Sequence, residues 1–310
     1  MKRIVFAFTT SWVICSSAYS QGYGQENFIK INGKNVEILI SGIEHNQTDK
    51  PVIVFENGRG TTFNYWEKVI SEVAKESVVF AYNRPRIGKS EDDNIPPSMK
   101  HIVDNLRIML KEKGLNPPYL LVGHSFGACY IRSFASYYPN EIAGLIFVDP
   151  HDFTKRIGYG RLPYREIGLT EAQIDSLFAS FVHYGEQFLL NGPKHHVEEV
   201  KISGELNDTG HEECYRNPLP DIPVHFIMAG GFYLYPDELP TIYDREKLFR
   251  INSNIQMKRW LELLYPLKYG RLFYDSNSGH TIQKDNPDLV ITSIEMARND
   301  YNRMKNSKIQ

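Results

Sequence analysis

The chain has 310 residues, enough for one large α/β domain with an insertion. Hydrophobic residues make up 42% and charged residues 23%, a globular composition that excludes disordered and collagen-like classes. With 35 basic and 37 acidic residues the net charge is −2, so no basic excess points to nucleic acid as a partner. Three cysteines exclude a disulfide scaffold and a four-cysteine zinc site.

The first twenty residues have the pattern of a secretory signal. Two basic residues precede a short apolar stretch, and Ala18-Tyr19-Ser20 fits a small-x-small cleavage pattern. The apolar stretch is too short to span a bilayer, and no later stretch reaches 18 apolar residues. We therefore expect a secreted or periplasmic protein, cleaved after Ser20 and without stable membrane insertion. An uncleaved anchor and a lipoprotein attached through Cys15 are the weaker alternatives.

Strand and helix patterns alternate through the rest of the chain. Two short segments, 28–31 and 36–40, flank Asn32-Gly33 and predict a hairpin. Apolar runs typical of strands buried on both faces occur at 51–55, 77–81, 119–123, 144–148, 224–228 and 271–274. Helical periodicity appears at 63–74, 102–113, 127–138, 255–264 and 289–304. The alternation predicts an α/β fold with a mostly parallel eight-stranded sheet and helices on both faces.

The alternation breaks once, between residues 152 and 220. This segment has no clear strand, one helical stretch at 171–181 and many aromatic residues. A structureless loop of such length is uncommon in a compact domain. We expect a mainly helical lid inserted into a core formed by 21–151 and 221–310. Its aromatics favour packing within the lid over contact with an apolar substrate group.

Gly123-His124-Ser125-Phe126-Gly127 matches the pattern G-x-S-x-G, which is weak alone. Here an apolar strand runs straight into the motif and a helix-forming segment leaves it. Such a tight turn requires glycine beside the serine and lifts the hydroxyl above the carboxyl edge of the sheet. We therefore expect Ser125 to be a nucleophile.

A serine nucleophile needs a base, and His280 is the best placed histidine. It follows the last predicted strand and precedes the last helix, so it can reach the sheet edge. His124 is expected to point away from the serine hydroxyl. The lid pair His195-His196, with two glutamates just after it, could suggest a metal site, but a solvated lid face is favoured.

The acid that orients the histidine has three candidates. Asp149 directly follows the sixth strand, whereas Asp237 and Glu238 lie in a long loop after the seventh. An orienting acid needs a short, rigid approach. We favour Asp149, then Asp237, then Glu238.

The oxyanion of the tetrahedral intermediate needs backbone donors placed in advance. One is expected from Phe126, the residue after the nucleophile. The loop 56–60 supplies glycines that allow close approach, and the N–H of Arg59 is the expected second donor, with Gly58 as the alternative.

Together these segments resemble the α/β-hydrolase superfamily from about Lys50 to Lys305. The matching pieces are Glu56-Asn-Gly-Arg-Gly with Trp66, Tyr82-Asn-Arg-Pro-Arg-Ile-Gly-Lys-Ser90, the Ser125 motif, and Ser278-Gly-His-Thr-Ile-Gln with Asn286-Pro287. Two departures occur: Asn57-Gly58 stands where the family often has His-Gly, and Asn83-Arg84 where it often has Asp-Arg. The usual early acid after the seventh strand is also missing, which again favours Asp149.

The resemblance implies a serine hydrolase with a small-molecule substrate and no metal or organic cofactor, and the predicted signal adds that it is exported. Carboxylic ester hydrolysis is the first expectation. A peptidase acting on small N-terminal residues, an amidase, a lactonase and a carbon–carbon hydrolase are alternatives, and so is a non-catalytic binding module of the same fold. Relatives that open epoxides or remove halides use an aspartate nucleophile, which Ser125 argues against.

Two cysteines remain after the predicted cleavage, Cys129 and Cys214. An exported compartment would permit them to pair, but we expect them to lie apart as buried residues.

Overall fold

The computed structural model describes residues 25–215, 217–233 and 241–307. The predicted signal segment lies outside these residues, and so do Asp237 and Glu238.

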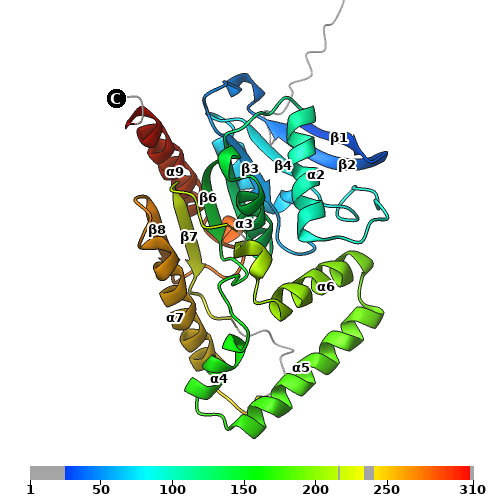
Figure 1. The fold of residues 1–310 in the computed structure, drawn as a ribbon, viewed down its shortest axis with the longest axis vertical. Coiled ribbons are helices and arrows are strands. Elements are labelled where there is room, and N and C mark those ends of the chain that lie inside the picture. The colour runs from blue at the N-terminus through cyan, green and yellow to red at the C-terminus, as the bar shows by residue number, and fades with distance from the viewer. Residues whose placement is uncertain (1–24, 216, 234–240, 308–310) are drawn as a thin grey trace, which may run out of the picture.

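An eight-stranded sheet organises the described part of the chain (Figure 1). Its strand order is β1-β2-β4-β3-β5-β6-β7-β8. The pairs β1/β2 and β2/β4 are antiparallel and all other pairs are parallel, which confirms the predicted mostly parallel sheet. The strands are β1 (Gln25–Ile31), β2 (Lys34–Ser41), β3 (Val52–Glu56), β4 (Val79–Tyr82), β5 (Tyr119–His124), β6 (Ile142–Val148), β7 (Val224–Ala229) and β8 (Gly270–Asp275).

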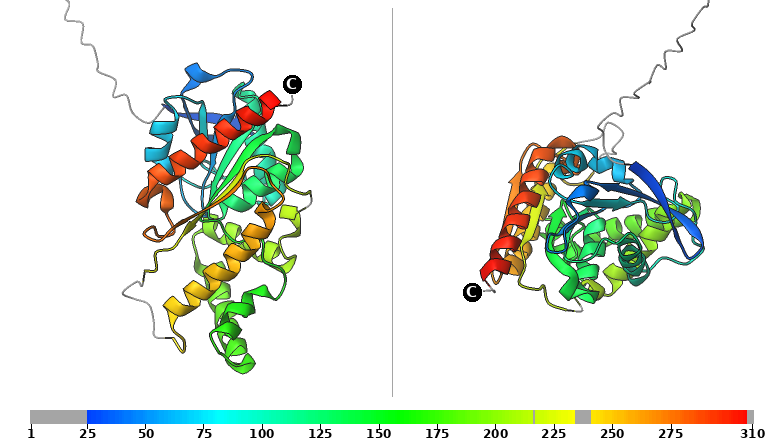
Figure 2. Two further views of the ribbon diagram at one scale, coloured as in Figure 1. Left: turned by 90° about the vertical axis from the view of Figure 1, so that its left-hand side faces the viewer. Right: turned by 90° about the horizontal axis from the view of Figure 1, so that it is seen from above.

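Helices cover both faces of the sheet (Figure 2). Buried side chains of α2, α3 and α7 pack on one face, and those of α1 and α9 pack on the other. A short helix, α8, precedes α9. The bounds are α1 (Glu67–Val73), α2 (Met99–Glu112), α3 (Gly127–Tyr137), α7 (Arg245–Leu264), α8 (Ile282–Asp285) and α9 (Pro287–Ser307).

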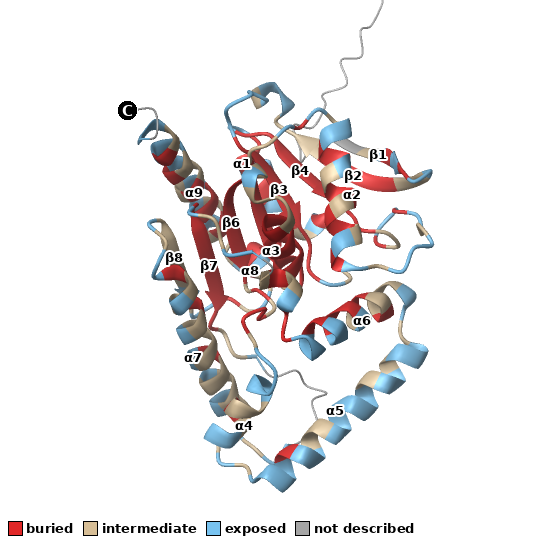
Figure 3. Ribbon diagram, in the orientation of Figure 1, coloured by how far each residue is buried: buried red, intermediate tan, exposed pale blue. Residues whose placement is uncertain are grey.

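The central strands place the candidate site. Every residue of β3, β5 and β6 is buried, because helices cover both faces of these strands (Figure 3). Parallel neighbours bring their carboxyl ends to one edge of the sheet. The loop at 56–61, Ser125 and Asp149 follow these three strands at that edge, and His280 follows β8.

The segment 152–220 is helical wherever it is regular, and its described residues include no strand. It contains α4 (Leu162–Glu166), α5 (Glu171–Asn191), α6 (Lys194–Asp208) and a helical turn, Glu212–Tyr215. On α5 only Ile174 is buried, so this helix extends away from the core (Figure 3). On α6, Ile202 and Leu206 join the core beside α2 and α3.

Three helices differ from the expectation. Helix α5 continues beyond the predicted end at 181, and α7 begins at Arg245, where the side chain of Asp244 accepts a 2.9 Å hydrogen bond from the N–H of Lys247. Helix α6 has no predicted counterpart. Its many charged residues obscure the apolar positions, although the helix buries three apolar residues, Val197, Ile202 and Leu206, together with Glu199 and Ser203. For α6, tertiary contacts therefore matter more than periodicity does.

The expectation that Cys129 and Cys214 lie apart is wrong. Both are buried free thiols, and Sγ of Cys214 lies 4.0 Å from the carbonyl oxygen of Cys129. It also lies 3.7 Å from Oγ of Ser133. The turn Glu212–Tyr215 packs against α3 across 85 residues of sequence, a separation over which no local pattern predicts contact.

Candidate active site

Ser125 occupies a sharp turn between β5 and α3. Its φ of 51° lies in the left-handed region, which is costly for a residue with a side chain and places the hydroxyl at the tip of the turn. A Cβ at Gly123 would lie 2.8 Å from the carbonyl oxygen of Gly127. A Cβ at Gly127 would lie 2.5 Å from the carbonyl oxygen of Glu56. Both glycines are therefore required by close backbone approach.

His280 lies between Ser125 and Asp149. Its Nε2 is 2.9 Å from Oγ of Ser125, and its Nδ1 is 2.6 Å from Oδ2 of Asp149. The structure thus brings together the three side chains that the sequence assigns to nucleophile, base and acid. A carboxylate on Nδ1 holds the proton there and leaves Nε2 free to accept the serine proton.

The loop before His280 is shaped by Asp275 at the end of β8. Its Oδ2 accepts hydrogen bonds from Oγ of Ser278 at 2.7 Å and from Nδ2 of Asn286 at 2.8 Å. These bonds lower the pKa of the Asp275 carboxyl, which therefore stays ionised. The family-like Ser278 and Asn286 thus hold the turn that presents the imidazole.

Asp149 is fixed by the sheet. Its N–H donates to the carbonyl of Ile227 at 2.7 Å, and its Oδ1 accepts from the N–H of Ala229 at 2.9 Å. Its other oxygen, Oδ2, is the one that faces His280. The carboxylate therefore has a rigid approach from the end of β6, as the sequence argument required.

The side chain of His124 contacts the backbone of His280. Its Nε2–H donates to the carbonyl oxygen of His280 at 2.7 Å, so it does not act on the serine hydroxyl. Burial, with the nearby His280 as a smaller cause, lowers the pKa of His124 to about 3. The side chain is therefore neutral at physiological pH, and its Nδ1 has no partner within the described chain.

A pocket of about 270 Å³ opens beside the serine hydroxyl. Gly58, Arg59, Ser125, Phe126 and His280 line it, and so does His151. Burial, and then the neighbouring His211, lower the pKa of His151 to about 3, so this imidazole is neutral as well.

The two expected oxyanion donors face the same pocket. Among the described residues the backbone N–H groups of Arg59 and Phe126 have no hydrogen-bond acceptor. Both are therefore available to a ligand oxygen placed next to Ser125.

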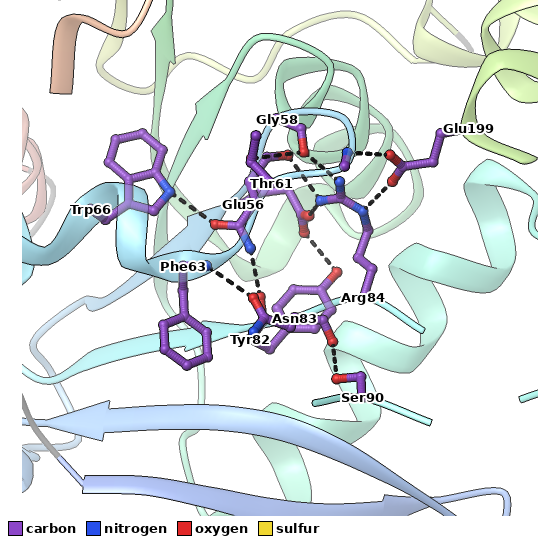
Figure 4. Close-up of polar contacts among 12 residues, drawn as sticks. Glu56, Gly58, Thr61, Phe63, Trp66, Tyr82, Asn83, Arg84, Ser90 and Glu199 are labelled. Atoms are coloured by element: carbon purple, nitrogen blue, oxygen red, sulfur yellow. Dashed lines mark hydrogen bonds and ion pairs between the residues drawn. The ribbon is translucent and has the colours of Figure 1, made fainter. Parts of the chain in front are cut away.

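The loop 56–61 rests on a buried polar network (Figure 4). Nδ2 of Asn57 donates to the carbonyl of Tyr82 at 2.7 Å, and Nε1 of Trp66 donates to Oδ1 of Asn57 at 3.0 Å. Oδ1 of Asn83 accepts from the N–H of Phe63 at 2.9 Å. The two asparagines that depart from the family pattern therefore have structural roles.

Glu199 is the site residue that the sequence argument missed. The solvated face expected for 195–199 is wrong: Glu199 is 5% exposed and lies against Arg84 and Gly60. Its neighbour Glu198 pairs with Arg86. Within the described ranges, no group of three His, Cys, Asp or Glu side chains could hold a metal ion.

Comparisons with known proteins agree with this architecture. The family model described as "alpha/beta hydrolase fold" matches residues 51–188. The chain has the α/β-hydrolase fold, and the match to the family model supports a place in that superfamily. No helix in the described part of the chain has the length and apolarity needed to cross a membrane.

Individual relatives are distant. The chain is 35% identical to the uncharacterised protein YqjL of Bacillus subtilis over 98 residues, which are 32% of this chain and 39% of YqjL. It spans two fifths or less of the length of the curated relatives it matches.

Two solved structures share the fold. The α/β hydrolase MGS-M2 from a deep-sea metagenome library is 17% identical, with a TM-score of 0.56 over 86% of this chain and 95% of that one. The enol-lactonase of Burkholderia xenovorans is 14% identical, with a TM-score of 0.52 over 86% and 98%. At these identities the likeness shows the fold alone.

Proposed function

We propose that this chain, which has the α/β-hydrolase fold, is an exported serine hydrolase that cleaves carboxylic esters through an acyl-enzyme. The contacts of His280 with Ser125 at 2.9 Å and with Asp149 at 2.6 Å carry the proposal. The predicted signal segment supports export, and 152–220 would serve as a helical lid over the site.

The proposed reaction begins with attack of Ser125 Oγ on the ester carbonyl carbon. Nε2 of His280 takes the serine proton, while the new oxyanion accepts hydrogen bonds from the N–H groups of Phe126 and Arg59. When the intermediate collapses, the carbon–oxygen bond to the alcohol breaks and the alcohol leaves with the proton from His280.

Water then completes the cycle. It attacks the acyl carbon and gives its proton to His280, and collapse of the second intermediate releases the acid and returns the proton to Ser125. The charge of Asp149 stabilises the imidazolium formed in both halves. The small pocket, bordered by polar groups, suits a small or medium-sized acyl group.

A substrate panel tests the proposal. The mature protein and its Ser125→Ala variant would be assayed with p-nitrophenyl esters of graded chain length and with aminoacyl arylamides. Turnover of esters that is lost in the variant supports the esterase. Faster turnover of arylamides would indicate the peptidase or amidase alternative, and the absence of all turnover would favour a binding module.

A further inference from the structure

One buried guanidinium determines how the loop 56–61 presents its N–H groups (Figure 4). Arg84 donates from Nη1 to the carbonyl of Asn57 at 2.9 Å and from Nη2 to the carbonyl of Gly58 at 2.7 Å. In a planar trans peptide the C=O and the N–H of the bond point in opposite directions. The N–H groups of Gly58 and Arg59 therefore point away from Arg84, on the side where both residues line the pocket.

Two carboxylates hold Arg84 in that position. Glu56 accepts from Nη1 at 2.5 Å through Oε1, and Glu199 accepts from Nε at 2.6 Å through Oε1. The side chains of Arg84, Glu56 and Glu199 are 2%, 0% and 7% exposed. Hydrogen bonds that are shielded from water in this way are strong. Loss of one partner leaves the other groups buried and unpaired, which destabilises the arrangement.

Glu199 also binds the loop itself. Its second oxygen, Oε2, accepts from the N–H of Gly60 at 2.7 Å. His196, one turn earlier on α6, packs so closely that a Cβ at Gly60 would lie 1.7 Å from its Nε2. Helix α6 therefore contacts the loop directly at Gly60 and indirectly, through Arg84, at the carbonyls of Asn57 and Gly58.

We propose that Glu199 is a positioning residue through which helix α6 sets the oxyanion donors of the Ser125 site. The inference rests on the proposed function, since an oxyanion forms only if a carbonyl is attacked. If Glu199 has this role, a high kcat requires helix α6 to be docked on the loop. The inserted segment then affects the stability of the transition state and not only the affinity for substrate.

Glu199→Gln is the most direct variant. It keeps the size of the side chain and an acceptor for the Gly60 N–H, but it removes the charge opposite Arg84. A loop that is held less rigidly misplaces its donors where charge develops, so the transition state suffers more than the bound substrate. We expect kcat to fall about 10- to 100-fold with KM within about threefold of wild type.

Glu198→Gln is the matched control. Glu198 lies on the same helix, and its substitution removes an ion pair with Arg86. The hydrogen bonds and ion pairs of the described residues connect neither Glu198 nor Arg86 to the loop 56–61. Its kcat is expected to stay within about threefold of wild type. Circular dichroism and thermal unfolding would establish that both variants are folded.

The experiment measures kcat and KM for a p-nitrophenyl ester, the pH dependence of kcat/KM, and inhibition by a phenylboronic acid. In the boronate complex the Ser125 oxygen bonds to boron, its proton passes to His280, and a boron-bound oxygen takes the place of the oxyanion. For Glu199→Gln we expect the inhibition constant to weaken in proportion to the loss of kcat, with an unchanged pH midpoint. A shifted midpoint would instead place the defect in the triad.

The outcomes separate the two proposals. If wild type neither hydrolyses esters nor binds the boronic acid, the proposed function fails and this inference fails with it. If wild type is active but Glu199→Gln matches it, changes only KM or shifts the pH midpoint, the inference is overturned and the proposed function stands. Should Glu199→Gln not fold, Glu199→Asp keeps the charge but is too short for both contacts; an unchanged kcat there also overturns the inference.

Discussion

The side chains of Ser125 and His280 and the loop 56–61 line one pocket, but the triad and the loop are held by different means. The side chains of His280 and Asp149 are 60% and 21% exposed. Backbone hydrogen bonds at strand ends hold Asp149, and the side chain of Asp275 holds the turn that carries His280. The loop rests on Arg84 and its two carboxylates, all nearly inaccessible to water. Groups that exchange protons with substrate and water must be accessible, whereas fixed dipoles act best when buried groups cannot reorganise.

The two sides also differ in how far they depend on the inserted segment. The triad residues come from the ends of β5 and β6 and from the loop after β8, all parts of the sheet edge. The loop is held by Glu199, which lies 139 residues from its partner Gly60. Displacement of α6 would therefore disturb the oxyanion donors first and leave the proton relay in place.

The largest effect is expected from removing the proton relay. Ser125→Ala and His280→Ala should each lower kcat for ester hydrolysis by about 10⁴-fold or more, because the members act as one unit. Steady-state assays with each variant, alongside unfolding curves, check this. Turnover within tenfold of wild type in either variant would refute the assignment.

Asp149→Asn should lower kcat nearly as much. The amide stabilises no imidazolium and favours the wrong tautomer, so kcat should fall about 10³- to 10⁴-fold with the fold retained. Asp237→Asn and Glu238→Gln, the alternatives from the seventh-strand loop, should each cost less than about tenfold. The reverse ranking would assign the acid to that loop and leave Asp149 a structural role.

Gly58→Ala probes the loop without touching a charge. The new Cβ would lie 2.8 Å from Nδ1 of His124 and 3.3 Å from Cβ of Ser125, so the loop or the imidazole must shift. A displacement of this kind should lower kcat about 10- to 100-fold. Gly204→Ala, on α6 with open space around it, is the control and should leave kcat unchanged. Equal kcat values for the two variants would show that the loop tolerates movement.

The buried histidines predict a smaller effect, on stability. His124 and His151 have folded-state pKa values of about 3, below the ordinary 6.5, so below pH 6.5 the unfolded chain binds protons that the folded chain does not. Each should therefore cost about 2 kcal/mol of unfolding free energy between pH 7 and pH 5. Burial also lowers the pKa of His225 to about 4, so we expect a similar loss from this residue, which lies on β7 away from the pocket.

Urea unfolding at pH 7, 6 and 5 measures this loss. In His225→Gln the loss between pH 7 and pH 5 should be smaller than in wild type by about 2 kcal/mol. An unfolding free energy that stays constant or rises as pH falls would contradict the burial of these imidazoles.

The same division explains what the sequence could predict. The role of Ser125 could be predicted because a local motif, with an apolar strand before it and a helix after it, encodes the turn. Asp149 followed from its place directly after a strand. The alternation of strands and helices likewise predicted the mostly parallel sheet and the helices on both of its faces.

The position of Glu199 could not be predicted from the sequence in this way. A Glu beside two histidines and another Glu on a charged helix has the pattern of a solvated face. Only the folded chain shows that this face meets Arg84, 115 residues earlier in the sequence. The contact of Cys129 with Cys214 was missed for the same reason: it depends on how the inserted segment docks, which no periodicity encodes.

The central claim is that Ser125, activated by His280, attacks carbonyl substrates. The most direct measurement is reaction of the mature protein with a fluorophosphonate, followed by mass spectrometry of its peptides. The account predicts one adduct, on Ser125, formed quickly by wild type, far more slowly by His280→Ala and not at all by Ser125→Ala. An adduct on another residue, or an unreactive folded wild type, would contradict it.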